Sequence, residues 1–380
     1  MLTLTCDRCD HQMTADAHTW RCPICHGPLS WQGPTTFSRT DIESDVPSLW
    51  RYRAALPVSQ GQTLTLGESI TPFVDATLDG VPVKFKLDCL MPTGSFKDRG
   101  AAVLLSFLRA VGVERAIEDS SGNAAAAIAA YAARAGIACT IFAPAHASAG
   151  KLVQTQAYGA TLNRITGSRD DVANAAIEAA TEPGATYASH NWHPFFIEGV
   201  KTWALEVWEQ LGYRAPDNVI VPVGSGSMLL GAWRAFSQLR AGGEIARIPR
   251  LFAAQATACA PIHTALAAGL NDAAPVERQP TVAEGIVITH PVRSRELLAA
   301  LRTSNGGSAA VSESDIADAL RHLAGQGLYA EPTSAVAAAA ARQLLAAGTI
   351  HPEETTVVML SGNGLKATET IQRLLTSPPS

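Results

Sequence analysis

Lys97 stands in an unusual setting, the segment LMPTGSFKDRG at residues 90–100. Small residues and Phe96 precede it, so part of its surroundings is apolar. A lysine in a partly desolvated site loses its charge more readily, and its amine can act as a nucleophile and then as a base. A solvated lysine at the start of a helix is the alternative. We interpret the segment as holding a lysine that forms a covalent bond.

Three further segments show the pattern of a strand, a turn of small residues and a helix. In parallel α/β proteins, ligands bind at the carboxyl ends of strands, where such turns lie. The following helix offers free N–H groups and a partial positive charge to an anion. A plain tight turn is the alternative for any one of them. The turns are SSGN at residues 120–123, GSGS at 224–227 and SGNG at 361–364.

The lysine segment and these turns together resemble a known family. The stretches PTGSFKDRG, SSGN, PVGSGS and LSGNGLK, in this order, resemble fold-type II pyridoxal-phosphate (PLP) enzymes, most closely the threonine synthase group. The resemblance extends from about Gly67 to Lys366. It implies a PLP-dependent lyase or synthase that acts on a small amino-acid substrate. It also implies a homodimer with a fold similar to that of the β subunit of tryptophan synthase.

The resemblance implies a role for each matched residue. Lys97 would form the internal Schiff base with PLP and serve as the catalytic base. The turn at 224–227 would cradle the cofactor phosphate. Asn123 would hydrogen-bond the ring hydroxyl, and Ser361 would face the pyridine nitrogen. The implied cofactor-binding set is Lys97, Phe96, Asn123, Gly224, Ser225, Gly226, Ser227 and Ser361, and the substrate carboxylate would bind Ser120, Ser121 and Gly122.

The hydroxyl of Ser361 constrains the expected chemistry. A carboxylate at this position would keep the pyridine nitrogen protonated and make the ring a strong electron sink, whereas a neutral hydroxyl does not. A short-lived carbanion at Cα favours expulsion of a side-chain leaving group over transamination. The expected reactions are therefore elimination or replacement at the β or γ carbon.

The chain departs from threonine synthases at residues that face the substrate. In the stretch SHNWHPFFIEGVKT at 189–202, Phe196 occupies the place where the family implies a phosphate-binding arginine. Phenylalanine cannot pair with a dianion. Ala124 replaces a threonine and cannot donate a hydrogen bond. We therefore expect a substrate other than O-phosphohomoserine. His190, Asn191 and His193 are candidates for a different side-chain pocket, with aromatic packing and a capped turn as the alternative.

Three other functions are kept open. The first is threonine synthase proper, with the phosphate of O-phosphohomoserine bound by other groups. The second is a serine/threonine dehydratase, because TVAEGIVITHPVR at residues 281–293 resembles that branch. The third is a zinc-ribbon binding protein that has lost catalysis, against which the acidic charge and the intact Lys97 segment argue.

Four cysteines near the N-terminus predict a metal site. They form two C-x2-C pairs separated by twelve residues, and four such thiolates can surround one tetrahedral zinc ion. A module this short has no room for a core, so metal binding would supply its folding energy. Two disulfides, or a ribbon that has lost its metal, are the alternatives. The predicted ligands of this structural zinc are Cys6, Cys9, Cys22 and Cys25.

Composition excludes several classes of protein. The 380 residues are 47% hydrophobic, and the formal net charge is −5 with no basic block, so we expect no nucleic-acid partner. We find no signal peptide and no apolar run of about 18 residues, so no membrane span is expected. The three scattered cysteines fit reduced core residues, and the expected location is the cytoplasm.

Helices alternate with short buried strands from Gly67 onward, which predicts an α/β fold with parallel-rich sheets. Together with the resemblance this gives two three-layer αβα domains with the cofactor between them, and an N-terminal four-cysteine zinc ribbon. The smaller domain is expected to close when the substrate carboxylate binds. The expected parts are the ribbon at 1–32, a connecting arm at 33–66, a large PLP domain at 67–99 and 206–380, and a small mobile domain at 100–205.

Overall fold

The computed structural model describes residues 2–147 and 149–376. The chain divides into two compact units, one formed by Met1–Ile70 and Lys97–Thr202, the other by Thr71–Phe96 and Trp203–Ser380. Each unit has its own parallel-rich sheet with helices packed on it. The α/β architecture expected from the sequence is therefore confirmed. The finer division into four parts stays a prediction.

The first unit is built on a four-stranded parallel sheet with the order β8-β7-β6-β9. Ile117 of β6 pairs with Thr140 of β7 and with Tyr187 of β9, so β6 is a central strand. All four strands run the same way, and their carboxyl ends therefore lie along one edge of the sheet. The strands are β6 (Arg115–Glu118), β7 (Ala138–Pro144), β8 (Thr161–Ile165) and β9 (Ala185–Tyr187).

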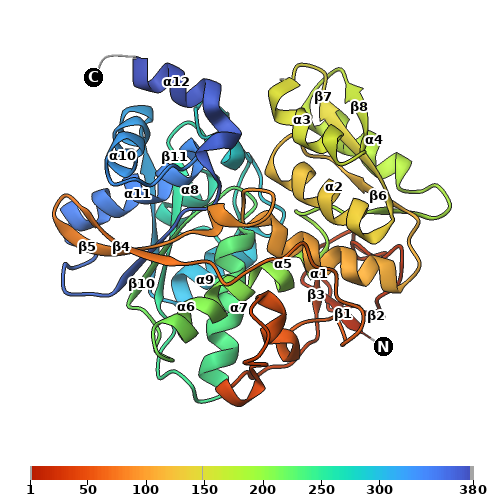
Figure 1. Ribbon diagram of the computed structural model, residues 1–380, viewed down its shortest axis with the longest axis horizontal. Coiled ribbons are helices and arrows are strands. Elements are labelled where there is room, and N and C mark those ends of the chain that lie inside the picture. The colour runs from red at the N-terminus through yellow and green to blue at the C-terminus, as the bar shows by residue number, and fades with distance from the viewer. Residues whose placement is uncertain (1, 148, 377–380) are drawn as a thin grey trace. The chain divides into compact units, whose positions relative to one another are not determined.

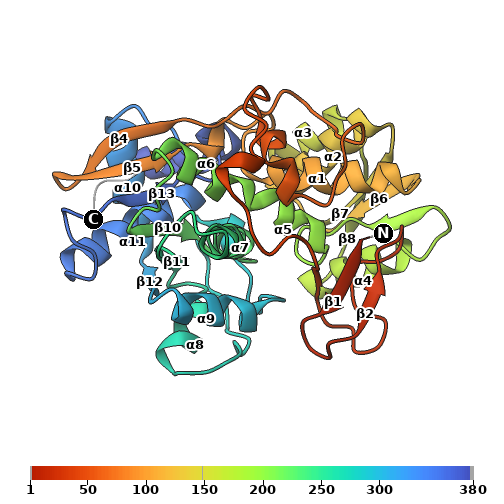
Figure 2. The ribbon, with the colours of Figure 1, turned by 90° about the horizontal axis from the view of Figure 1, so that it is seen from below.

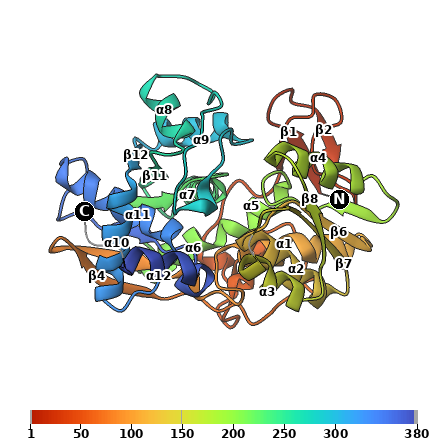
Figure 3. The same ribbon diagram turned by 90° about the horizontal axis from the view of Figure 1, so that it is seen from above.

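Helices cover both faces of this sheet. Helix α2 packs on β6 and β7 from one side and α4 from the other, as Figures 2 and 3 show. The alanines of α2 are buried, which lets its backbone lie close to the strands and to α1. Gly136 ends α2 in the left-handed conformation that glycine adopts without strain. The helices are α1 (Lys97–Ala110), α2 (Asn123–Ala135), α3 (Ala149–Ala157), α4 (Arg169–Ala179) and α5 (Pro194–Val200).

Helices α1 and α5 approach each other closely because glycines lie at their contact. A Cβ atom added at Gly199 of α5 would collide with the backbone carbonyl oxygen of Arg99 in α1. A Cβ atom at Gly100 would lie 2.6 Å from the ring of Phe196. The absence of side chains at these two positions therefore sets the distance between the helices that carry Lys97 and Phe196.

The N-terminal segment forms a small antiparallel sheet with the order β2-β1-β3, from β1 (Thr3–Cys6), β2 (Gln12–Thr14) and β3 (Leu29–Trp31). We call residues 2–32 the cysteine module. It is followed by two short 3-10 helices, η1 (Arg39–Asp41) and η2 (Leu49–Ala55). The Nε1–H of Trp50 donates a hydrogen bond to the carbonyl of Leu64, and Ser106 Oγ of α1 accepts one from the Leu64 N–H. The arm is thus fixed to the first unit.

The second unit is built on a six-stranded sheet with the order β12-β11-β10-β13-β5-β4. All neighbours are parallel except β4 and β5, which form an antiparallel hairpin at one edge. Buried valines, isoleucines and alanines make up its central strands, as expected for strands covered on both faces. The strands are β4 (Phe73–Leu78), β5 (Val81–Lys86), β10 (Asn218–Pro222), β11 (Arg250–Ala256), β12 (Gly307–Val311) and β13 (Thr356–Met359).

Helix α11 lies across this sheet and contacts five of its strands, β4, β10, β11, β12 and β13, while α8 and α9 pack on β11 and β12 from the opposite side (Figure 3). Figure 1 shows α10 beside α11. The helices that belong wholly to the unit are α7 (Ser227–Ala241), α8 (Pro261–Ala267), α9 (Ser294–Thr303), α10 (Glu313–Gly325), α11 (Pro332–Ala346) and α12 (Thr368–Thr376). The bounds of α6 are Thr202–Gln210, and the 3-10 turns are η3 (Asp88–Leu90), η4 (Glu284–Ile286) and η5 (Gly364–Ala367).

Across the described residues, no helix is both long and apolar enough to cross a membrane. The three cysteines outside the cysteine module are buried, and none of the seven cysteines forms a disulfide.

Candidate active site

The segment before Lys97 is fixed by backbone hydrogen bonds within the second unit. Phe96 N–H donates to the carbonyl of Ser361 at 2.9 Å, and Asn363 N–H donates to the carbonyl of Gly94 at the same distance. Gly94 has a φ of +86°, a conformation that favours glycine. The structure thus brings together two segments that the sequence singled out separately, the one before Lys97 and the turn at 361–364.

Lys97 itself is half-buried and begins helix α1 in the first unit. Its Nζ atom lies 5.7 Å from the centroid of the Phe196 ring. The next three residues of the motif, Asp98, Arg99 and Gly100, are buried, and Arg99 donates a hydrogen bond to Thr202 Oγ1 at 3.1 Å. The Asp-Arg-Gly part of the motif therefore anchors the helix, while the lysine side chain faces an aromatic ring.

Ser361 follows β13 and is buried, with 1% of its surface exposed. Its Oγ lies 3.1 Å from the Oγ of Ser334 in the first turn of α11. Ser334 also accepts a hydrogen bond from Gly362 N–H at 2.9 Å. Ser334 was missed in the sequence, where it appears only as a small residue in an alanine-rich helix. The pair gives the turn two hydroxyl groups, neither of which carries a charge.

The turn at 224–227 joins β10 to α7, a helix of 15 residues. Gly226 has a φ of +83°, and a Cβ atom at Gly224 would lie 2.8 Å from Ile286. Among the described residues, none accepts a hydrogen bond from the backbone N–H groups of residues 224–227. Unpaired N–H groups at the start of a long helix suit an anion such as a phosphate. The donor set therefore fits the phosphate of PLP.

The turn at 120–123 joins β6 to α2 in the first unit. Gly122 N–H donates to Ser120 Oγ at 3.2 Å, and α2 begins at Asn123. Ala124 is buried, with 2% exposed, so no solvent replaces the hydroxyl that a threonine would place there. The turn lies at the carboxyl end of a central strand, the position where parallel α/β folds bind ligands.

His190 pairs with a residue that the sequence did not reveal, Glu118, the last residue of β6. The Nδ1 atom of His190 lies 2.9 Å from Glu118 Oε1, and the His190 N–H donates to Oε2 at 3.1 Å. The Asp119 N–H also donates to the carboxylate, at 3.1 Å from Oε1. The two side chains are 72 residues apart in sequence but lie at the adjacent ends of β6 and β9.

Burial shifts the pKa values of this pair in opposite directions. Desolvation raises the pKa of the Glu118 carboxyl to about 7, against smaller lowering effects that include the charge of Lys97. Desolvation lowers the pKa of the His190 imidazole well below its ordinary value, and Lys97 acts in the same direction. Lys97 is therefore close enough to influence both groups. Nearby, Asp119 pairs with Arg169 at 2.5 Å.

The other residues of the 189–202 stretch differ in their surroundings. Phe196 is fully buried, and its ring centroid lies 6.0 Å from that of His190. His193 precedes α5 as its N-cap, and its Nδ1 accepts a hydrogen bond from Phe195 N–H at 3.3 Å. The buried Oδ1 of Asn191 has no hydrogen-bond partner within the described part of the chain. Phe196 thus lies beside Lys97 and His190 beside Phe196, whereas His193 caps α5. The substrate roles of these residues stay predictions.

The four cysteines of the module meet as expected from their spacing. Their sulfur atoms all lie within 4.8 Å of one another, with Cys6 and Cys25 at 3.4 Å and Cys9 and Cys22 at 3.7 Å. Four thiolates around one zinc ion at about 2.3 Å would be about 3.8 Å apart. Backbone N–H groups of Arg8 and Ile24 point at two of the sulfurs. The donor set fits a tetrahedral zinc ion.

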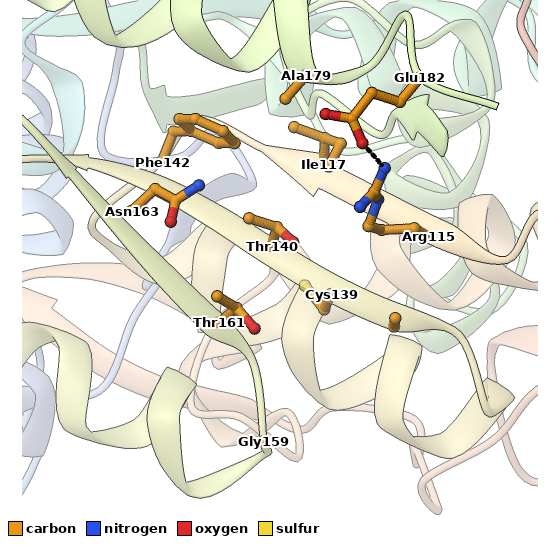
Figure 4. Close-up of a pocket in the computed structure, with 11 residues that line it drawn as sticks. Arg115, Ile117, Cys139, Thr140, Phe142, Gly159, Thr161, Asn163, Ala179 and Glu182 are labelled. Carbon is orange, nitrogen blue, oxygen red and sulfur yellow. Dashed lines mark hydrogen bonds and ion pairs between the residues drawn. The ribbon is translucent and has the colours of Figure 1, made fainter. Parts of the chain in front are cut away.

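A pocket of about 370 Å³ opens elsewhere on the first unit (Figure 4). Its lining includes Arg115, Ala138 and Thr161, the first residues of β6, β7 and β8, and the ion pair between Arg115 and Glu182. Because the lining also includes Ile117, Phe142 and Asn163, the pocket extends from the amino ends of the strands toward their middles. It contains none of the residues predicted for the active site.

Comparison with known proteins agrees with the candidate cofactor-binding segments described above for each unit. The model of the family "Pyridoxal-phosphate dependent enzyme" matches residues 64–362. Threonine synthase of Methanosarcina acetivorans is 32% identical, over 98% of this chain and 94% of its own. Threonine synthase of Methanocaldococcus jannaschii is 34% identical, over 84% of this chain and 80% of its own. The threonine deaminase isoform 2 structure from Solanum lycopersicum superimposes with a TM-score of 0.71 at 21% identity, covering 90% and 96% of the two chains.

The chain belongs to the pyridoxal-phosphate dependent enzyme family. It is a threonine synthase-like, fold-type II PLP-dependent enzyme, and this membership favours the enzymatic prediction over the non-catalytic alternative. When bound, PLP acts as an electron sink that stabilises negative charge at the substrate Cα.

Proposed function

We propose that the protein catalyses elimination or replacement at the β or γ carbon of an amino acid other than O-phosphohomoserine. One observation carries the proposal. Phe196, which stands where the family implies a phosphate-binding arginine, is fully buried and faces Lys97 across 5.7 Å. A buried aromatic ring offers no charge to a phosphate dianion. Ala124, which is also buried, replaces a threonine of the family, so a second polar group is missing from the same unit.

The proposal assigns the cofactor to the residues inferred from the sequence. Lys97 would hold PLP and afterwards act as the base at Cα, Asn123 would bind its ring hydroxyl, and Ser361 would face its ring nitrogen. The N–H groups of residues 224–227 would bind its phosphate. The absence of a hydrogen-bond acceptor for these N–H groups within the described residues supports the last assignment. The buried, uncharged Ser361–Ser334 pair supports elimination over transamination.

The substrate carboxylate would bind at Ser120, Ser121 and Gly122, at the N-terminus of α2. Two further parts of the proposal concern the whole protein. A structural zinc ion would be held by Cys6, Cys9, Cys22 and Cys25, which the short distances between their sulfur atoms support. The protein would be a homodimer, as the family resemblance implies.

Threonine synthase proper is the second candidate. The identity of 32% to a threonine synthase over nearly the whole chain favours it. In this case a group other than residue 196 would have to bind the phosphate, because Phe196 cannot. A serine/threonine dehydratase is the third candidate, and it is a special case of the proposed elimination.

The test is a direct assay with O-phospho-L-homoserine. The purified protein, with PLP bound, is mixed with this compound, and release of threonine and phosphate is measured. L-serine, L-threonine and O-acetyl-L-serine are assayed in parallel through the 2-oxo acid and ammonia that elimination releases. We expect turnover in the second group only. Robust threonine formation from O-phospho-L-homoserine would overturn the proposal and establish threonine synthase activity.

A further inference from the structure

The Glu118–His190 pair has the geometry of a proton-transfer device. Glu118 Oε1 lies 2.9 Å from one ring nitrogen of His190, so a proton can be held on either side of this contact. The remaining contacts of the Glu118 carboxylate are N–H groups of His190 and Asp119, which fix its orientation. A carboxylate that orients a histidine in this way leaves the second ring nitrogen, Nε2, for proton exchange.

The surroundings of the pair place it at the reaction site of the first unit. His190 stacks edge-on near Phe196, whose ring lies 5.7 Å from Lys97 Nζ. Glu118 is completely buried, and the His190 side chain is 10% exposed. Among the described residues, Nε2 of His190 has no hydrogen-bond partner. A buried histidine that keeps one nitrogen unpaired beside a candidate catalytic lysine is more than a packing residue.

The leaving group decides whether such a pair is needed. A phosphate leaves as a stable anion, and an enzyme that expels it needs a cation to bind it. A hydroxyl leaves poorly unless it receives a proton as the bond to carbon breaks. This chain lacks the implied cation at position 196 and has a proton donor close to Phe196 instead.

We propose that His190, oriented by Glu118, is the general acid that protonates the leaving hydroxyl of a 2-amino-3-hydroxy acid such as L-serine. This inference rests on the proposed function and names its substrate class. Lys97 removes the proton from Cα, the electron pair left at Cα forms the Cα=Cβ double bond, and the Cβ–O bond breaks with its electron pair moving to oxygen. His190 Nε2 gives its proton to that oxygen, which departs as water.

The protons of the Glu118–His190 pair also balance in this step. When Nε2 gives up its proton, Nδ1 keeps or receives the proton shared with Glu118 Oε1, so His190 ends neutral and Glu118 ends as a carboxylate. The pair regains one proton from solvent, and Lys97 releases the one it took. The unsaturated amino acid then takes up water and yields pyruvate and ammonia, so that the net reaction of L-serine consumes no further reagent.

Two substrates that differ only in the leaving group provide the test. L-serine and β-chloro-L-alanine both give pyruvate and ammonia, but chloride needs no proton to leave. We expect His190→Gln to lower the turnover of L-serine by about 100-fold or more, while β-chloro-L-alanine changes by less than about threefold. The matched control is His263→Gln, because His263 bonds Ser308 Oγ at 3.0 Å and is not among the predicted site residues. We expect this variant to leave both rates unchanged.

The outcomes separate the two proposals. Equal losses for both substrates in His190→Gln would mean that His190 only supports the fold of the site, and the inference would be wrong. No pyruvate from L-serine in the unmodified protein, with turnover of β-chloro-L-alanine, would also reject it, yet elimination would stand. Threonine formation from O-phospho-L-homoserine would instead reject the proposed function. The visible absorbance of bound PLP in every variant shows that loss of rate is not loss of cofactor.

Discussion

The indole ring of Trp20 meets the ring of Trp192 edge-on, with 5.6 Å between the ring centroids. Trp20 also packs edge-on against Tyr187 at 4.8 Å. The cysteine module is therefore attached to β9 and to the segment after it, which contains His190. Thr186 Oγ1 reinforces the attachment by donating a hydrogen bond to the carbonyl of Ala17. We therefore expect a change in the fold of the module to affect the residues that we propose to line the substrate site.

Removal of the metal is the first prediction. In the proposed site, a module of this size would owe its folding energy to zinc, so Cys22→Ser should release the ion, lower the thermal midpoint and alter the tryptophan fluorescence that Trp20 and Trp192 contribute. Zinc content, a melting curve and emission spectra measure these effects. Cys259→Ala, at a buried cysteine outside the module, serves as the control and should keep one zinc ion per chain. Protein that purifies without zinc would contradict the site.

Replacement of the lysine is the second prediction. Lys97→Ala should abolish covalent attachment of PLP, which borohydride reduction followed by mass spectrometry of the chain detects. Loss of the base alone should lower turnover by about 100-fold to 10,000-fold. Lys84→Ala, at a partly exposed lysine paired with Asp75, is the matched control. A reduced PLP adduct on Lys97→Ala would assign the attachment to another lysine.

The third prediction concerns restoration of the implied arginine. Phe196→Arg would bury a guanidinium group against Gly100, close to Lys97, in the place of an apolar ring. An uncompensated buried charge destabilises a protein by about 3–5 kcal/mol. We therefore expect a large loss in the free energy of unfolding and no gain of threonine synthase activity. Phe196→Leu, which keeps the site apolar, should be less destabilised. Efficient use of O-phospho-L-homoserine by Phe196→Arg would show that this position alone selects the substrate.

The pH dependence of leaving-group protonation is the fourth prediction. Burial raises the pKa of Glu118 to about 7, and Lys97, Asp119 and Arg169 are the charged groups around the pair. Because the acid form is active, kcat/KM for L-serine relative to β-chloro-L-alanine should be constant below about pH 7 and fall above it. Taking the ratio cancels the titration of Lys97. In Glu118→Gln the ratio should be low and independent of pH; a ratio that still falls above pH 7 would assign the titration elsewhere.

The fifth prediction tests the contact between α1 and α5. Gly199→Ala places a methyl group against the carbonyl of Arg99, and forcing extra volume into a packed contact costs about 1–3 kcal/mol. Chemical denaturation should show this loss. Gly325→Ala at the end of α10 is the control, because a Cβ atom there meets nothing within 4 Å. The control should be neutral or slightly stabilised, and equal stability of both variants would show that the helices move apart freely.

Local patterns predicted the parts of the site that depend on backbone geometry. The turn at 224–227 and the four cysteines could be found because glycine and paired cysteines are needed at fixed spacings. Glu118 could not be found in this way. A single acidic residue at the end of a strand resembles any surface glutamate, and its burial depends on the pairing of β6 with β9. Ser334 escaped for the same reason, since its contact with Ser361 depends on how α11 crosses the sheet.

The glycine contact between α1 and α5 also has a consequence for how the substrate specificity of such an enzyme can evolve. Arg99 and Gly199 hold two helices at a fixed separation, and Lys97 stands at the start of one while Phe196 projects from the other. In the proposed site, substitutions in the stretch before Gly199 would alter which substrates fit without moving the amine of Lys97. A family of enzymes with such a helix contact can acquire new substrates by a few substitutions and keep its reaction chemistry.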